Sequence, residues 1–152
     1  MVMDSDRIRL LQQVPIFGGI TAENLGFLLR EGQRLCFRRG QYLFREGDPA
    51  EVIYVLESGA VQVFRQQGPE RHTLHRLGEG DCLGEMALID LFPRSASALA
   101  ETDGSAIAFS PEAMLGLYQK DLEQFTLIQM NLARELSRRL RHANDLLFSQ
   151  HP

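Results

Sequence analysis

The chain has 152 residues, of which 44% are hydrophobic and 24% charged, and its formal net charge is −4 at pH 7. This length and composition predict a single globular domain over residues 1–152 and exclude a largely disordered chain. The acidic balance gives no general attraction for nucleic acid, so we expect no direct DNA binding. No run of about 18 apolar residues is present to span a membrane, so we expect no membrane partner.

The N-terminal segment, residues 1–33, has the pattern of two helices. Apolar residues recur with roughly helical spacing from Ile8 onward, and Pro15 ends the run. Thr21 is a suitable N-cap for the second helix, because its hydroxyl can accept a hydrogen bond from a free backbone N–H group. The first residues lack a basic stretch followed by an apolar run, so they do not resemble a signal peptide.

The central segment, residues 34–109, changes to a period of two, which is typical of half-buried strands. Clusters of Gly, Pro, Asp and Ser divide the segment into short runs. The clearest strand candidates are Val52–Leu56, Ala60–Arg65, His72–Leu77, Ala96–Ala100 and Ser105–Phe109. Many short strands at this spacing predict a mainly β fold, an eight-stranded jelly roll (a double-stranded β-helix), with flanking helices.

The C-terminal segment, residues 110–148, returns to a helical pattern. Ser110 is a candidate N-cap, and the proline after it suits the first helical position. A short helix is expected first, and then a long one from about Leu122 to Phe148. The long helix would extend about 40 Å at 1.5 Å per residue. One drifting stripe holds its apolar residues: Phe125, Ile128, Leu132, Leu136, Leu140, Ala143 and Leu147.

This long helix extends beyond what one small barrel can cover. An exposed apolar stripe marks a surface for a partner. The simplest partner is the same helix of a second copy, packed around a two-fold axis. We therefore expect a homodimer through the C-terminal helix.

The segment around Gly84 carries the residue types that a phosphorylated ribose requires. Glycine allows backbone N–H groups to approach an anion, because no Cβ intervenes. Arg94 offers a planar fork of donors that matches two phosphate oxygens, and Ser95 adds a hydroxyl donor. A phosphate would repel the carboxylate of Glu85, which therefore suits a sugar hydroxyl of the same ligand. The segment Glu85–Asp90 is expected to form a short helical turn whose first N–H groups point at the phosphate.

This segment closely resembles the phosphate-binding cassette of cyclic nucleotide-binding domains, as in catabolite activator proteins and the regulatory subunits of cyclic AMP-dependent kinase. The family pattern is Gly-Glu-hydrophobic-Ala-Leu, a short loop, and then Arg-Ser/Thr/Ala-Ala. Every position is filled here, by Gly84, Glu85, Met86, Ala87 and Leu88 and by Arg94, Ser95 and Ala96. The resemblance extends over about the whole chain, and it implies the β-roll fold with helices at both ends.

The resemblance also implies a role for each site residue. Glu85 would accept the ribose 2′-hydroxyl, and Arg94 and Ser95 would hold the cyclic phosphate. Backbone N–H groups would complete the anion site, apolar side chains would pack on the sugar or base, and an amide would contact adenine. The backbone N–H groups would be those of Met86, Ala87 and Ala96. The apolar side chains would be Val63 and Leu74, and the amide would be that of Asn144.

The predicted function is therefore a non-enzymatic sensor of a cyclic nucleotide. The expected ligand is cyclic AMP, with cyclic GMP as the second possibility because Ser95 follows the arginine. No cofactor is expected, and the downstream protein that receives the signal stays open. Two cysteines, Cys36 and Cys82, stand outside any Cys-x-x-Cys pattern, which fits a reducing cytoplasm. The alternative is a degenerate fold that serves dimerisation or protein interaction without nucleotide.

Two other groups of residues could suggest a binding site, but each has a simpler structural interpretation. His72 and His75 lie near Glu79, but residues three apart on a strand point to opposite faces, so no metal site is expected. Four arginines gather on the last helix, and a solvated helix face is the expected interpretation, although a nucleic-acid surface is the alternative. They are Arg134, Arg138, Arg139 and Arg141, and Glu135 has the spacing of a surface ion pair with Arg139.

Overall fold

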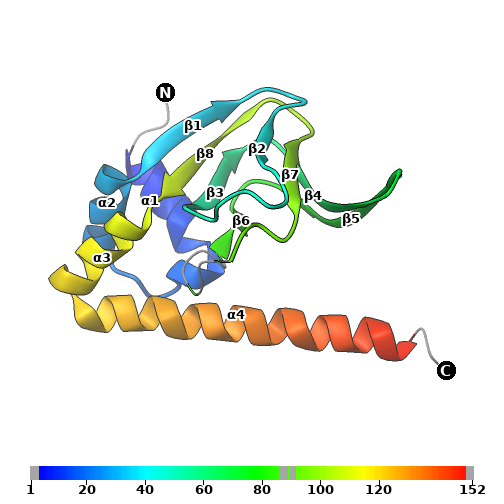
Figure 1. The fold of residues 1–152 in the computed structure, drawn as a ribbon. Helices are drawn as coiled ribbons and strands as arrows, with labels where there is room; N and C mark the ends of the chain where they lie inside the picture. Colours follow the sequence, from blue (N-terminus) through cyan, green and yellow to red (C-terminus); the bar gives the residue numbers. More distant parts are fainter. Residues whose placement is uncertain (1–3, 86–88, 90–91, 150–152) are drawn as a thin grey trace.

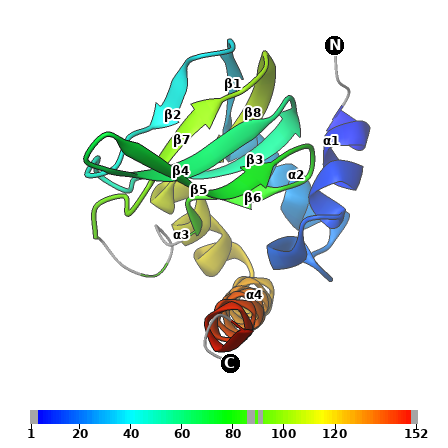
Figure 2. The same ribbon diagram turned by 90° about the vertical axis from the view of Figure 1, so that its right-hand side faces the viewer.

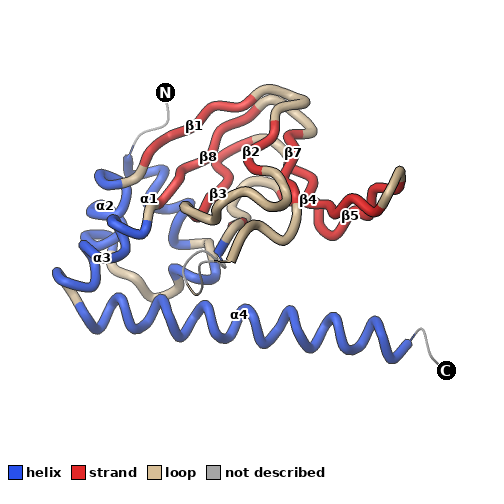
Figure 3. Tube along the Cα trace, in the orientation of Figure 1, coloured by secondary structure: helices blue, strands red, loops and turns tan. Residues whose placement is uncertain are grey.

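The computed structural model describes residues 4–85, 89 and 92–149. Within these residues, eight strands form two four-stranded antiparallel sheets, in the orders β1-β8-β3-β6 and β2-β7-β4-β5 (Figures 1 and 3). The strands are β1 Gln33–Phe37, β2 Tyr42–Phe44, β3 Ile53–Ser58, β4 Val61–Gln67, β5 Glu70–Leu77, β6 Cys82–Leu83, β7 Ser97–Ala100 and β8 Gly104–Phe109. This confirms the prediction of a jelly roll that is preceded and followed by helices along the chain.

Helices flank the barrel at both ends of the chain. They are α1 Asp4–Gln12, the short 3₁₀ helix η1 Pro15–Phe17, α2 Ala22–Glu31, α3 Pro111–Lys120 and α4 Leu122–Ser149. Both predicted N-caps form, because the hydroxyls of Thr21 and Ser110 each accept a backbone N–H bond at 3.2 Å. None of the helices in the described ranges is long and apolar enough to cross a membrane.

Two hydrophobic cores share the strands β3 and β8. Val55 and Phe109 point toward the helices and pack in the first core with residues such as Leu11 and Ile128. Their neighbours along the strands, such as Leu56, point into the barrel and form the second core. Because successive side chains on a strand face opposite sides, both faces of this sheet are buried. The helical layer and the barrel are therefore packed against one common sheet.

A buried carboxylate also joins the helical layer to the barrel. Glu57 on β3 is 7% exposed. Its side chain pairs with Arg7 of α1 at 3.3 Å and with Arg34 of β1 at 3.4 Å. A charge that is removed from water needs such partners, because its desolvation is otherwise uncompensated.

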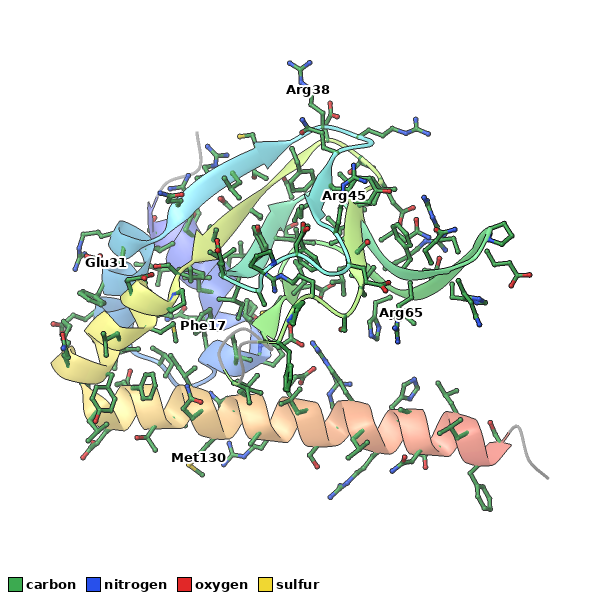
Figure 4. All side chains as sticks on the ribbon, in the orientation of Figure 1. Phe17, Glu31, Arg38, Arg45, Arg65 and Met130 are labelled. Atoms are coloured by element: carbon green, nitrogen blue, oxygen red, sulfur yellow. The ribbon has the colours of Figure 1, made fainter. Side chains whose placement is uncertain are left out.

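The long helix α4 crosses beneath the barrel and continues under the β4–β5 hairpin (Figures 1 and 2). Its first half is anchored, since Ile128 and Leu132 are fully buried in the first core. Between them on the helix, Asn131 donates from Nδ2 to the carbonyl oxygens of Ile16 at 3.1 Å and Gly18 at 2.8 Å. Figure 4 shows Met130 on the side of the helix that faces away from the barrel.

The predicted apolar stripe therefore has two different environments. Its members up to Leu136 pack against the chain's own core. Further along, Leu140 and Leu147 of the stripe are exposed, as are Leu146 and Phe148 next to it. Only this distal part of the stripe is a free apolar surface.

Replacing Asn131 with alanine tests the anchor of α4. N131A would leave the buried Ile16 carbonyl and the partly buried Gly18 carbonyl without their donor, so we expect a loss of about 1–3 kcal/mol in the free energy of unfolding. Urea unfolding measures this loss. The matched control is S137A on the exposed side of the same helix, which should change stability by no more than about 0.5 kcal/mol. Equal effects of the two changes would contradict the anchoring role.

Candidate functional site

A cavity of about 670 Å³ lies between the barrel wall and α4. Strands β4, β5 and β6, the segment 92–96 and the middle of α4 contribute side chains to its lining. The lining includes seven of the ten predicted site residues: Val63, Leu74, Gly84, Glu85, Arg94, Ser95 and Ala96. Met86 and Ala87 lie outside the described residues, as does most of the helical turn expected over 85–90.

Arg94 is a buried cation in the wall of this cavity. Its side chain donates from Nη2 to the Val52 carbonyl at 2.6 Å and from Nη1 to the Gly84 carbonyl at 3.3 Å. The face of Phe44 lies 4.2 Å from the guanidinium carbon. Burial lowers the pKa of Arg94, but a guanidinium stays charged in proteins. Within the described structure, the buried Nε atom has no hydrogen-bond acceptor, so the group keeps a donor for an anion.

The backbone of Arg94 is fixed as firmly as its side chain. Its N–H donates to the carbonyl of Asp48, and its carbonyl accepts from the N–H of Gly47, both at 2.8 Å. The loop between β2 and β3 thus holds the backbone, and Val52 at the end of that loop holds the guanidinium. This arrangement presents the cation in one orientation, as an anion site requires.

Gly84 is required next to this arginine for two reasons. Its φ of +80° is a conformation that side chains with a Cβ rarely adopt. A Cβ at this position would also lie 2.5 Å from Nη1 of Arg94 and 3.1 Å from the Val52 carbonyl oxygen. The glycine thus leaves room for the guanidinium.

Glu85 is a buried carboxylate in the same cavity, with 4% of its surface exposed. It forms an ion pair with Nη1 of Arg139 from α4. The Nε atom of Arg139 also contacts Glu135 at 3.3 Å, so the predicted pair forms. It faces the cavity rather than the solvent, because the Glu135 side chain is only 11% exposed and both residues line the cavity. The expectation that Arg139 belongs to a solvated helix face is wrong, because its guanidinium turns to the barrel and lines the cavity. Its place close after Leu136 of the packed stripe is the signal that could have shown this.

A β-bulge shapes the opposite wall. Val63 pairs with His75 and Phe64 pairs with Thr73, which leaves Leu74 as the extra residue of β5. Adjacent residues of a regular strand face opposite sides, yet Leu74 and His75 both line the cavity. Burial, and then the positive charge of Arg139 on α4, lower the pKa of His75.

His72 does not join His75 in the cavity and lies 3.6 Å from Glu70 instead. Within the described residues, His, Cys, Asp and Glu side chains form no group of three that could hold a metal ion. Cys82 lines the cavity as a buried thiol, and burial raises its pKa to about 12. This cysteine is therefore an uncharged wall group at neutral pH.

Asn144 is exposed on α4 and is not among the residues that line the cavity. The helix contributes Glu135, Arg138, Arg139 and His142 instead. Residues two apart on a helix do not share a face, so Asn144 and His142 point in different directions. The contact of Asn144 with a base stays a prediction.

Residues 34–121 match the family model of the cyclic nucleotide-binding domain. Gly84, Glu85 and Arg94, three residues of the motif that carries the family resemblance, line one cavity. The chain belongs to the cyclic nucleotide-binding domain family.

Two relatives and one solved structure are similar to the chain over most of its length. It is 37% identical over 131 residues to the cyclic AMP receptor protein of Thermus thermophilus, covering 86% of this chain and 59% of the relative. It is 31% identical to a CRP-like cAMP-activated global transcriptional regulator of Mycobacterium tuberculosis, covering 94% of this chain and 64% of the relative. The crystal structure of Thermus thermophilus catabolite activator protein superposes with a TM-score of 0.79 at 36% identity, over 90% of this chain and 62% of that chain. The chain thus spans about three fifths of these relatives.

Replacing Gly84 with alanine tests its fit against Arg94. G84A combines a positive φ with a clash against the guanidinium, so it should destabilise the fold more than a positive-φ glycine in open space. Gly40 is the matched control, because its φ is +87° and a Cβ there would meet nothing within 4 Å. In urea unfolding, we expect G84A to cost about 1–3 kcal/mol more than G40A. Equal costs would mean that backbone strain alone selects the glycine.

Proposed function

We propose that this chain is a non-enzymatic sensor module that binds a cyclic nucleotide, with 3′,5′-cyclic AMP as its preferred ligand. The observation that carries the proposal is the buried Arg94 guanidinium, whose Nε has no acceptor among the described residues and which shares its cavity with the buried Glu85. One group attracts a phosphate and the other a hydroxyl, and a cyclic ribose phosphate carries both within a few ångströms.

In this proposal, each part of the ligand has its own partner. Arg94 and Ser95 hold the cyclic phosphate, with backbone N–H groups of Met86, Ala87 and Ala96. Glu85 accepts the ribose 2′-hydroxyl. Val63 and Leu74, which both line the cavity, pack on the sugar or base.

The preference for cyclic AMP is supported by the relatives, two of which are described by their response to that nucleotide. Ser95 after the arginine leaves cyclic GMP as a weaker ligand. Binding without turnover is supported by the absence of a nucleophile, base and orienting acid in any catalytic arrangement in the sequence. Both cysteines are free thiols, which fits the reducing cytoplasm.

Residues 1–152 act as one domain in this proposal, because the helices and the barrel share the sheet that contains β3 and β8. The module passes its signal to a downstream protein and needs neither DNA nor a membrane. The alternative, a fold that keeps the barrel and helix for association but binds no nucleotide, predicts no heat of binding in the titrations below.

Replacing Arg94 tests the phosphate site. R94A should lower the affinity for cyclic AMP by the equivalent of about 2–5 kcal/mol, because a charge-assisted contact to a buried phosphate is lost. R94K should restore little, because the two-point fork is absent. Isothermal titration calorimetry measures the affinity of both variants for cyclic AMP. Titrations with cyclic GMP as a competitor compare the two nucleotides.

R45A is the matched control, since Arg45 stacks on Tyr42 outside this cavity. R45A should bind as the unmodified chain does. Near-normal affinity in R94A would rule out the assigned phosphate site.

A ligand without the 2′-hydroxyl tests the role of Glu85. 2′-Deoxy cyclic AMP should bind at least about tenfold more weakly than cyclic AMP, because the buried carboxylate of Glu85 loses its hydrogen-bond partner. Competition against a fluorescent cyclic nucleotide measures the ratio. Equal affinities would show that Glu85 does not bind the ribose.

The distal part of α4 supports a homodimer, because its large apolar side chains have no cover in the single chain. L147E should shift the chain toward monomer, since a charge in an apolar helix interface is costly. Analytical ultracentrifugation over a concentration series measures this. L115E is the control, because Leu115 is similarly exposed but lies on α3. A chain that stays monomeric at high concentration without either change would contradict the dimer.

A further inference from the structure

A second hollow of the surface lies beside β1 and β2, on the side of the barrel away from α4 (Figures 1 and 2). This β1–β2 groove has a volume of about 480 Å³ and is lined by residues 35–37, 40–43, 45 and 106. It shares no lining residue with the cavity of the candidate site. The groove is therefore a separate surface that the nucleotide proposal leaves unused.

The floor of the β1–β2 groove is apolar. The buried side chains of Phe37 and Ala106 line it together with Leu35 and Leu43, which are partly exposed. Leu35 is 39% exposed although it lies in a strand of the barrel. The lining contains no carboxylate among the residues that the structure describes. Such a floor suits an apolar side chain of a partner, because covering it removes apolar surface from water.

Three arginines surround this floor. Arg45 is part of the lining, and Arg38 and Arg39 are exposed in the turn between β1 and β2, where Figure 4 shows Arg38 pointing outward. Among the described residues, none of the three guanidinium groups has a carboxylate partner. The Asp48 carboxylate accepts the backbone N–H of Arg45 at 2.9 Å instead. The Asp103 carboxylate likewise accepts the backbone N–H of Arg39 at 2.8 Å. The three side chains can therefore bind acidic groups of a partner.

The two strands that border the groove also leave backbone groups for a partner. β1 is the edge strand of the sheet β1-β8-β3-β6, and β2 is the edge strand of the sheet β2-β7-β4-β5. On an edge strand, every second residue directs its N–H and C=O groups away from the sheet. An extended segment can bind such an edge through its backbone while its side chains fill the adjoining pockets. The groove thus suits an extended segment better than a helix.

Strand β2 contributes to both the groove and the cavity of the candidate site. Leu43 lines the groove, whereas the next residue, Phe44, lines the cavity and lies over the guanidinium of Arg94 at 4.2 Å. The loop after Arg45 is bound to the same arginine, because Gly47 donates its N–H to the Arg94 carbonyl at 2.8 Å. One short strand therefore contacts both the proposed phosphate site and any partner in the groove.

We propose that the β1–β2 groove is the docking site for the downstream protein, which binds through an extended acidic segment that carries an apolar side chain. The apolar side chain packs on the floor, and the flanking carboxylates bind Arg38, Arg39 and Arg45. That the partner receives a nucleotide signal rests on the proposed sensor function, whereas the docking of an acidic segment does not.

The test uses a peptide Glu-Glu-Leu-Glu-Glu with blocked ends, in a ¹⁵N NMR titration of the full chain. The backbone amide signals of residues 35–45 should shift, and the affinity should fall as salt is added. The same peptide with glycine in place of leucine should bind about tenfold more weakly, because the apolar contact is lost. Equal binding of the two peptides would overturn the proposal, since the arginines would then attract any polyanion, nucleic acid included.

Replacing Arg45 tests the charged part of the groove. R71Q is the matched control, because Arg71 stacks on Phe64 at 4.1 Å much as Arg45 stacks on Tyr42 at 4.0 Å, but lies on β5 outside the groove. R45Q should weaken the binding of the leucine peptide about two- to fivefold, as for an exposed ion pair. R71Q should leave it unchanged. Equal effects of the two variants would rule out the assigned groove.

The link through β2 is tested by titrating the leucine peptide with and without saturating cyclic AMP. We expect the peptide affinity to change at least about twofold, and the affinity for cyclic AMP to change by the same factor when peptide is present. An unchanged affinity would show that the groove does not receive the nucleotide signal.

The docking site and the sensor function fail separately. If the peptide shifts the signals of residues 35–45 but the chain does not bind cyclic AMP, the docking site stands and the sensor function is wrong. If cyclic AMP binds but the peptide causes no shift in residues 35–45, the sensor function stands and the docking site is wrong.

Discussion

A guanidinium buried in a barrel wall cannot shed its charge, so the structure around it must satisfy that charge. Here the carbonyl groups of Val52 and Gly84 and the face of Phe44 surround Arg94. The same need fixes the glycine turn and the loop between β2 and β3. The proposed anion site is thus prepared by contacts within the protein, and such preorganisation would lower the ordering cost that binding must overcome.

The remaining wall of the cavity belongs to an element with two different halves. The first half of α4 is held by apolar packing and by the amide of Asn131, neither of which depends on charge. In the second half, Arg139 forms an ion pair with Glu85 of the cavity wall. Ionic contacts are weakened by salt and redirected by a new charge, whereas apolar contacts are not. One continuous helix therefore combines a half that is anchored by apolar packing with a half whose ion pair to Glu85 depends on charge.

Features that are local in sequence were the ones that could be predicted. The caps at Thr21 and Ser110 and the long helix follow from short-range rules, and the structure has them. The strands β2 and β6 have three and two residues, which is too short for a period of two to show. The strand β1 was missed as a separate run because four of its five residues are exposed.

The residues of the candidate site also divide into those that are local in sequence and those that are not. Gly84, Glu85 and Arg94 could be predicted because they lie in one short motif, and they meet in one cavity. Arg139 lies outside that motif, and its orientation depends on how α4 is rotated against the barrel, for which the packed stripe through Leu136 is the one sequence signal. The same rotation brings His142 to the cavity and leaves Asn144 outside its lining. Helical periodicity gives the relative directions of side chains but not which direction meets a neighbouring element.

The buried Glu57 has a consequence for anyone who wishes to move this module into another protein. The segment that carries the family pattern is 34–121. A graft cut to that segment would lose Arg7 and leave Glu57 with only part of its charge compensation. It would also expose the face of β3 and β8 that the N-terminal helices and α4 cover. The portable unit is therefore the barrel together with its helices, and an insertion point should lie outside α1 and beyond the anchored half of α4.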